Sequence, residues 1–190
     1  YKTEWREPKL LIIYVVNADG RKEHTFLPVI DGTMQGPDAL FTLLGRYLER
    51  LNIGQADQIL FVADGAPWIW NRIELLIAHL DLRPEQCLEL VDFYHAVEHL
   101  GKVAALRMSW HAKERKKWVI RHRKLLLTGK VEQVIEAVRS ICRGRNSKEI
   151  QSHQNYFIKN AGRMMYAKVK AMNMPIGSGA VESAIRRVIN

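Results

Sequence analysis

The sequence predicts an α/β fold in which a mixed sheet with packed helices is followed by an all-helical segment. Three observations predict it. Two apolar stretches near the N-terminus are joined by the turn sequence NADG at 17–20, and further apolar stretches at 58–63 and 86–91 alternate with helical patterns. From about residue 94 onward only helical patterns remain. Adjacent strands followed by alternating helix and strand are typical of a mixed sheet covered by helices.

The first half of the chain supplies the predicted sheet. The β-branched content of KLLIIYVV predicts a buried strand at 9–16, and a second strand is expected to return at 23–30. Gly36-Pro37-Asp38 begins a helix that runs to about residue 51, with leucines repeating on one face. Strands at 58–63 and 86–91 flank a helix at 68–80.

The second half is predicted to be helical. Helical patterns cover 94–107, 111–127, 130–143, 147–160 and 162–173, with weak breakers between them. A tight loop with the sequence PIGSG follows at 175–179, and a last helix runs from Ala180 to the end of the chain.

Composition limits the class of protein. The chain has 190 residues and 47% hydrophobic content, which is enough for an ordinary packed core. It contains neither a signal peptide nor an apolar run long enough to span a membrane, so we expect a cytoplasmic protein without a membrane partner.

The two halves of the chain differ in charge. Residues 1–100 hold 9 Lys and Arg against 15 Asp and Glu, a balance of −6, whereas residues 101–190 hold 20 against 5, a balance of +15. A positive field of this size favours a polyanion, and nucleic acid is the commonest one in a cytoplasmic setting. The alternative is a solvated basic face that has no partner.

Two acids far apart in the sequence are the candidate catalytic and metal-binding residues. Asp64 ends the apolar stretch at 58–63, and open α/β sheets place their sites at the carboxyl ends of strands. Glu182 lies in GSGAVES, where small residues would let a phosphate backbone or a metal approach closely. Each has a structural alternative, because Asp64 could cap or shape the following turn and Glu182 could simply favour a helix N-terminus.

The segment DFYH at 92–95 puts an acid and an imidazole about one turn apart where a strand becomes a helix. We expect Asp92 and His95 to support the site; the alternative is that Asp92 is an N-cap and His95 a hydrogen-bonding neighbour. Residues 95–99 also match H-x-x-E-H, in which two histidines bind zinc and the glutamate is the base of a metalloprotease. That hypothesis needs a third ligand from elsewhere, and a protease does not need so basic a second half.

One predicted helix carries much of the positive charge and is the candidate DNA-binding surface. Its cations would neutralise phosphates, while Trp110 and Trp118 could stack on bases or, as we favour, pack in the core. The candidate DNA-binding residues are Lys113, Lys116, Lys117, Arg121, Arg123, Lys124 and, near Glu182, Arg186 and Arg187.

Three segments together resemble a known family. FVADGAPWIW, VDFYHAVEHL and PIGSGAVESAIRRVIN, in that order, resemble bacterial insertion-sequence transposases of the DDE type, in the group related to Mutator elements. The resemblance covers nearly the whole chain. It implies a ribonuclease H-like core at 1–107, an all-helical insertion at 108–174 and a returning core helix at 175–190. It puts Asp64 on the second catalytic Asp, Glu182 on the final Glu, and Asp92 and His95 on a supporting acid-x-x-His signature.

The first catalytic Asp of that family has no clear match. Only four strands are visible where the fold has five, so we expect the missing strand and its Asp to precede Tyr1, which makes this chain the central part of a catalytic domain. Asp31 is a tempting substitute, but it follows the second predicted strand instead of lying within the first.

The resemblance implies cleavage and strand transfer of double-stranded DNA at the ends of a mobile element and at its target. Two Mg²⁺ (or Mn²⁺) ions would be held by Asp64, Glu182 and the missing Asp. With two of three carboxylates, the chain alone should bind metal poorly and cut nothing. The resemblance also implies a bacterial, nucleoid-associated enzyme that forms a homo-oligomer on DNA. The non-enzymatic alternative is a transposase-derived DNA-binding protein that has lost catalysis.

Overall fold

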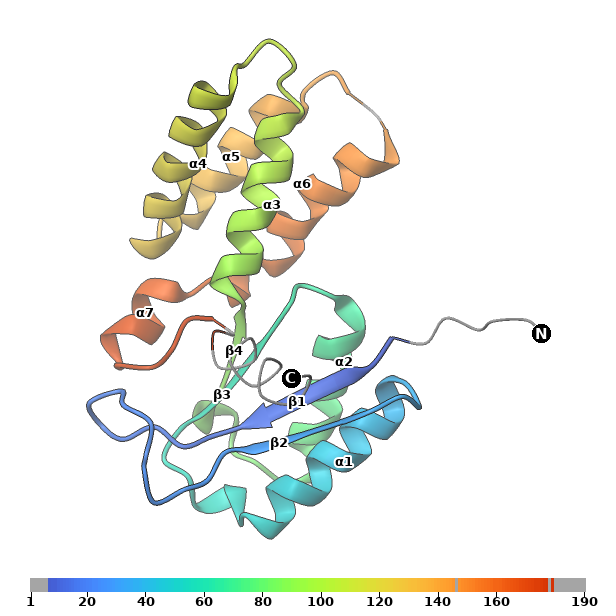
Figure 1. The fold of residues 1–190 in the computed structure, drawn as a ribbon, viewed down its shortest axis with the longest axis vertical. Coiled ribbons are helices and arrows are strands. Elements are labelled where there is room, and N and C mark those ends of the chain that lie inside the picture. Colours follow the sequence, from blue (N-terminus) through green and yellow to red (C-terminus); the bar gives the residue numbers. More distant parts are fainter. Residues whose placement is uncertain (1–6, 146, 178, 180–190) are drawn as a thin grey trace, which may run out of the picture. The chain divides into compact units, whose positions relative to one another are not determined.

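The computed structural model of the protein describes residues 7–145, 147–177 and 179 and has a mixed α/β structure (Figure 1). The described residues form two compact units, one comprising 7–61 with 66–88 and the other 62–65 with 89–177. The predicted helix from Ala180 to the chain end lies outside the described residues. Glu182, Arg186 and Arg187 therefore also lie outside them.

The first unit contains an antiparallel strand pair and two helices. The strands are β1 (Lys9–Ile13) and β2 (Val29–Thr33), and the helices are α1 (Pro37–Arg50) and α2 (Pro67–His79), with short 3-10 turns at Ile53–Gln55 and Pro84–Gln86. Both helices begin with proline, whose missing N–H has no intrahelical partner at that position anyway. The helices approach closely, since a Cβ added at Gly45 would lie 3.4 Å from Leu76 Cδ1.

Strands β3 (Ile59–Ala63) and β4 (Cys87–Val91) form a second two-stranded sheet. The backbone N–H of Asp92, directly after β4, donates to the carbonyl oxygen of Ala63, the last residue of β3, at 2.7 Å. The carboxyl ends of the two strands therefore lie side by side. Leu90 and Val91 are fully buried, which fixes this end of β4 in the core.

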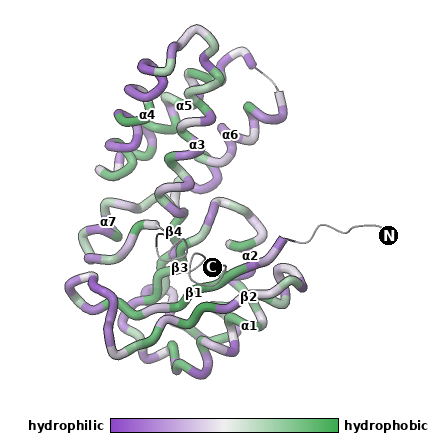
Figure 2. Tube along the Cα trace, in the orientation of Figure 1, coloured by the Kyte–Doolittle hydropathy of each residue, from purple (hydrophilic) through white to green (hydrophobic). Residues whose placement is uncertain are grey.

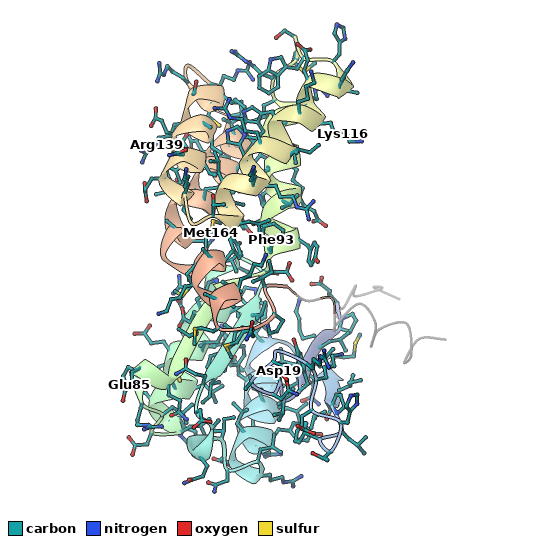
Figure 3. The ribbon with its side chains drawn as sticks, turned by 90° about the vertical axis from the view of Figure 1, so that its left-hand side faces the viewer. Asp19, Glu85, Phe93, Lys116, Arg139 and Met164 are labelled. Carbon is teal, nitrogen blue, oxygen red and sulfur yellow. The ribbon has the colours of Figure 1, made fainter. Side chains whose placement is uncertain are left out.

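The rest of the second unit is helical. Its helices are α3 (Phe93–Ala105), α4 (Ala112–Leu127), α5 (Val131–Cys142), α6 (Lys148–Asn160) and α7 (Tyr166–Ala171), with a 3-10 turn at Ala161–Arg163 between α6 and α7. Hydrophobic and hydrophilic stretches alternate along these helices in Figure 2, as expected of amphipathic helices around a shared core. In Figure 3, Lys116 extends away from the helices, whereas Phe93 and Met164 are buried.

Most predicted elements are confirmed. The helices expected at 94–107, 111–127, 130–143 and 147–160 are α3 to α6, and the strands expected at 58–63 and 86–91 are β3 and β4. The helix expected at 162–173 is instead a 3-10 turn followed by the shorter α7. The division at residues 107 and 174 stays a prediction; in the packing, α3 belongs with the helical unit.

The second strand was predicted at the wrong place. β2 begins at Val29, not at residue 23, and it includes Asp31 and Gly32, for which a loop was expected. Residues 17–28 contain two turns, at 18–20 and 24–26. In the first, the side chain of Asn17 accepts hydrogen bonds from the backbone N–H groups of Asp19 and Arg21, and a single bridge between Val16 and Lys22 extends the strand pair. The described strands also form two separate pairs where one mixed sheet was expected.

Within the ranges 7–145 and 147–177, no helix combines the length and the apolar character needed to cross a bilayer.

Candidate active site

Asp64 lies where the sequence predicts it, directly after β3 and before the turn into α2. The chain enters α2 through Gly65, Ala66 and Pro67, a sequence that ends the strand and starts the helix within three residues. Asp64 is exposed. An exposed carboxylate at the carboxyl end of a partly buried strand is accessible to a cation or to a substrate.

Asp92 occupies the corresponding place after β4 and has a defined structural role. Its side chain is 4% exposed, and Oδ1 accepts hydrogen bonds from the backbone N–H groups of Tyr94 at 2.7 Å and His95 at 3.1 Å. Asp92 is therefore the N-cap of α3, the structural alternative considered from the sequence. The cap and a chemical role do not compete, because a carboxylate has a second oxygen.

The loop that precedes Glu182 in the sequence returns to this place. The backbone N–H of Phe93 donates to the carbonyl oxygen of Ile176 at 3.0 Å. A Cβ added at Gly177 would lie 2.6 Å from Tyr94 Cδ2 and 3.5 Å from Asp92 Oδ1, so only glycine fits here without a shift. The chain thus comes back to the end of β4 five residues before Glu182.

Two residues of α6, Tyr156 and Asn160, also lie at this site, and the sequence analysis missed both. The amide nitrogen of Asn160 donates to the carbonyl oxygen of Gly65 at 3.3 Å. The hydroxyl of Tyr156 is buried without a hydrogen-bond partner in the described part of the chain. No local pattern marks these residues, because they meet the β3 turn only through the packing of α6.

The pKa of Tyr156 is raised by its surroundings. Burial is the largest cause that raises this pKa above its ordinary 10.0. The carboxylates of Asp64, Asp92 and Glu98 raise it further, because nearby negative charge disfavours a phenolate. Tyr156 therefore keeps its proton beside three acids of the second unit.

His95 lies next to a small histidine cluster. His95 Nδ1 is 3.7 Å from Glu98 Oε2, and its ring meets that of His99 edge to face, with centroids 5.1 Å apart. His99 stacks on Tyr156 with 3.7 Å between centroids, and its Nδ1 is 3.4 Å from Nδ1 of His153. Burial, followed by the nearby charges of His95, Lys102 and His153, lowers the pKa of His99 from 6.5 to about 4. This histidine is neutral at pH 7.

Metal ligation can be judged only for the described residues. Among residues 7–145, 147–177 and 179, no three His, Cys, Asp or Glu side chains converge as a ready metal site. The H-x-x-E-H hypothesis thus gains no third zinc ligand from this part of the chain. The carboxylates of Asp64 and Asp92 offer the hard oxygen donors that Mg²⁺ prefers, and the third predicted donor, Glu182, lies outside the described residues.

The candidate DNA-binding helix, α4, presents six of its cations to solvent. On a helix of 3.6 residues per turn, most of them lie within about 60° of Ile120, which is 56% exposed. The exposed cations are Lys113, Lys116, Lys117, Arg121, Arg123 and Lys124. The rings of Trp110 and Trp118 are half-buried with centroids 6.2 Å apart, and Trp118 lies 4.0 Å from the ring of His122. These contacts agree with packing as the role of the two tryptophans.

Asp31, the tempting substitute for the first catalytic Asp, is held within the first unit. Its Oδ2 accepts a hydrogen bond from the hydroxyl of Tyr47 at 2.6 Å, and its Oδ1 accepts one from the N–H of Gly32 at 2.7 Å. These two bonds lower the pKa of Asp31. A structural role in joining β2 to α1 accounts for this residue.

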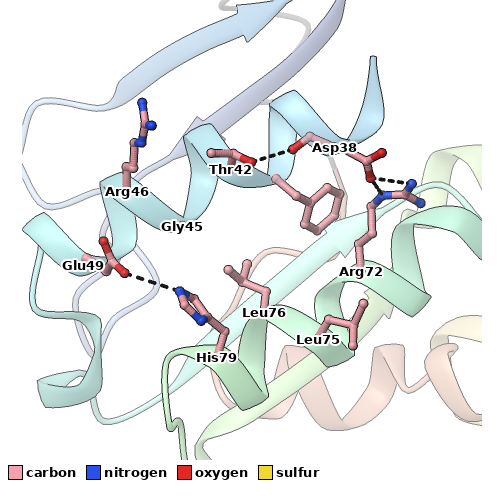
Figure 4. A pocket seen from close by; sticks show the side chains of 10 residues that line it. Asp38, Thr42, Gly45, Arg46, Glu49, Arg72, Leu75, Leu76 and His79 are labelled. Carbon is pink, nitrogen blue, oxygen red and sulfur yellow. Dashed lines mark hydrogen bonds and ion pairs between the residues drawn. The ribbon is translucent and has the colours of Figure 1, made fainter. Parts of the chain in front are cut away.

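A pocket of about 500 Å³ lies between α1 and α2 and contains none of the predicted site residues (Figure 4). Leu75, Leu76 and Phe41 line it together with charged groups. Arg46 also lines the pocket, and four of the other polar side chains form two pairs: Arg72 Nη2 is 2.7 Å from Asp38 Oδ1, and His79 Nε2 is 3.6 Å from Glu49 Oε1. These pairs and the apolar side chains beside them do not form a catalytic pattern.

In comparisons with protein-family models, curated proteins and solved structures, no match to this chain was found.

Proposed function

We propose that this chain is the central part of a DDE transposase catalytic domain, with a ribonuclease H-like core interrupted by a helical insertion. The observation that carries the proposal is the return of Ile176 and Gly177 to Asp92, beside the end of β3 that bears Asp64. The segments whose sequences resemble the family are 61–70, 91–100 and 175–190, and parts of all three meet there. A transposase site needs such a convergence of acids from distant segments.

In this proposal Asp64 and Glu182 hold the metal ions, and Asp92 supports them. Bound Mg²⁺ or Mn²⁺ would activate a water or a DNA 3′-hydroxyl and stabilise the leaving oxygen. Asp64 contributes an exposed carboxylate on a short turn, whereas the buried Asp92 fixes the start of α3 and adds negative charge. A two-ion site requires a third carboxylate in addition to Asp64 and Glu182.

The exposed cations of α4 bind the phosphates of double-stranded DNA. Phosphate contacts position a duplex without reading its sequence, so recognition of element ends would come from other parts of the protein. Assembly as a homo-oligomer on DNA and association with the bacterial nucleoid belong to the same proposal.

The decisive experiment uses the full-length protein that contains this chain, with DNA carrying the ends of its element. Asp64→Asn and Glu182→Gln are expected to abolish Mg²⁺-dependent strand cleavage while DNA binding is kept. Asp57→Asn, an equal change at an exposed acid, is the matched control and should cleave normally. If the folded wild-type protein does not cleave, or if neither substitution changes cleavage, the enzyme proposal fails and the non-catalytic DNA-binding protein is favoured.

The role of α4 is tested by the salt dependence of DNA binding. Lys116→Gln with Lys117→Gln should lower the slope of log K against log salt by about 2, because each phosphate contact contributes about 0.9. Lys148→Gln with Lys159→Gln removes the same charge from exposed positions of α6 and should leave the slope nearly unchanged. Equal effects of the two pairs would show that only net charge matters.

A further inference from the structure

The last turn of α6 is attached to the turn that carries Asp64. Asn160 is 3% exposed, and its side-chain nitrogen donates both to the carbonyl oxygen of Gly65 at 3.3 Å and to that of Tyr156 at 2.9 Å. Both neighbours are carbonyl oxygens, which accept but do not donate, so only the NH₂ group of Asn160 can serve them. An ionised aspartate of the same size could not make either bond.

Gly65 leaves no space between this turn and α6. A Cβ added there would collide with the ring of Tyr156 and lie 2.7 Å from Asn160 Nδ2. The Tyr156 ring is in turn held by the stack on His99. The position of Asp64 is therefore tied, through Gly65, to two side chains of a helix more than ninety residues later in the sequence.

The residues that follow Asn160 hold the neighbouring strand. Arg163, in the 3-10 turn after α6, forms an ion pair with Glu89 of β4. Tyr166 at the start of α7 meets the ring of Phe93 edge to face, with centroids 5.1 Å apart. One continuous segment of the helical unit thus contacts the carboxyl ends of both acid-bearing strands.

We infer that Asn160 is a positioning residue, which fixes the Asp64–Gly65 turn and thereby sets the affinity of the site for its divalent cation. The inference rests on the proposed function only for the cation; the mechanical link between Asn160 and the turn stands on the contacts alone. In this role Asn160 does not contact the substrate. It acts through the backbone of Gly65, so its loss should loosen the turn before it changes the chemistry.

The link is tested first by hydrogen exchange in the wild-type chain and two variants. Asn160→Asp keeps the shape and removes the donor, and it should speed amide exchange at 62–66 by about three- to tenfold, which corresponds to one net hydrogen bond. Asn155→Asp, the same change at an exposed asparagine of the same helix, is the matched control and should leave exchange at 62–66 unchanged. Exchange in α1 serves as the internal reference for global folding.

A second variant tests the same contact from the other side. Gly65→Ala pushes a methyl group toward Tyr156 and Asn160, and it should speed exchange at 156–160 by a similar factor while α1 stays protected. The link between Asn160 and the Asp64–Gly65 turn would be overturned if exchange at 62–66 in Asn160→Asp, or at 156–160 in Gly65→Ala, were as slow as in the wild type. Because each variant tests the contact separately, the exchange experiment still decides the question if one of the two variants fails to fold.

The functional part is tested with Mn²⁺ as the probe in the full-length protein, by water-proton relaxation. Asn160→Leu removes the same donor without adding a negative charge near the cation; it should speed exchange at 62–66 in the same way and raise the Mn²⁺ dissociation constant by about three- to tenfold, with the Mg²⁺ requirement of cleavage shifted in parallel and DNA affinity unchanged. Unchanged Mn²⁺ affinity despite faster exchange would overturn the positioning role. A wild-type protein that binds no Mn²⁺ would instead end the proposed function, while the exchange data would still decide the link.

Discussion

Asp92 allows the structural and the chemical roles of one acid to be separated. Its Oδ1 accepts two backbone N–H groups of α3 in a site that is 4% exposed. Replacing an N-cap by alanine costs about 0.5–2 kcal/mol, and two partly buried N–H donors lose their partner, so Asp92→Ala should lower the free energy of unfolding by about 2–3 kcal/mol. Asparagine caps about as well as aspartate and has an oxygen for the same two donors, so Asp92→Asn should cost less than about 1 kcal/mol, mainly from the lost charge at the helix N-terminus.

The assay is urea unfolding of the chain followed by far-UV circular dichroism, with unchanged slopes as the check on two-state behaviour. Ser147→Ala removes a second N-cap, an exposed one that accepts from Ile150 N–H at 3.2 Å, and should cost about 0.5–1 kcal/mol. If Asp92→Asn is as destabilising as Asp92→Ala, the capping explanation is refuted. If Asp92→Asn is stable but abolishes the proposed cleavage by the full-length protein, the negative charge has a role beyond the cap.

Two further predictions concern stability. Folding lowers the pKa of His99 from 6.5 to about 4, so as the pH falls the unfolded chain binds a proton at this histidine before the folded chain does. The free energy of unfolding is therefore unaffected by protonation of His99 above about pH 6.5 and decreases as the pH falls from there toward 4. After discounting for the partial exposure of His99, the decrease in the free energy of unfolding is about 1–2 kcal/mol. In His99→Gln the urea midpoints at about pH 7 and pH 5 should therefore lie closer together than in the wild type. An unaltered difference between the two midpoints would show that His99 does not cause this pH dependence. Leu126→Ala, at a fully buried position of α4, should cost about 2–5 kcal/mol in unfolding free energy, whereas Ile120→Ala on the exposed face should change it by less than about 0.5; equal costs would mean that α4 is oriented differently.

The helices could be predicted because their apolar periodicity is long and regular. In α5, for example, Val134, Ile135, Val138 and Ile141 repeat at helical spacing, and all four are buried. The ends of β3 and β4 were also found from the sequence, since each apolar run stops at an acid, Asp64 or Asp92.

β2 could not be placed from the sequence because its residues are extended through pairing with β1, against their own conformational preference. Asp31 and Gly32 are poor strand formers, and they are extended because they lie opposite Leu11 and Leu10 of β1. The contacts of the site with α6 were missed for a related reason: Asn160 and Gly65 are 95 positions apart, and nothing in either neighbourhood identifies the other. Periodicity reports which face of an element is buried, but not which distant residue covers it.

The attachment of Asn160 to Gly65 limits how the helical unit can change in length. Each residue added to an α-helix rotates everything after it by about 100°. One extra residue in the middle of α6 would turn the asparagine away from the carbonyl group it serves, and would displace Arg163 from Glu89 at the same time. A residue added at the turn between α4 and α5, around Gly129, would leave that register intact. Insertions and deletions are therefore tolerated at the turn between α4 and α5, but they disrupt these contacts when they fall within α6.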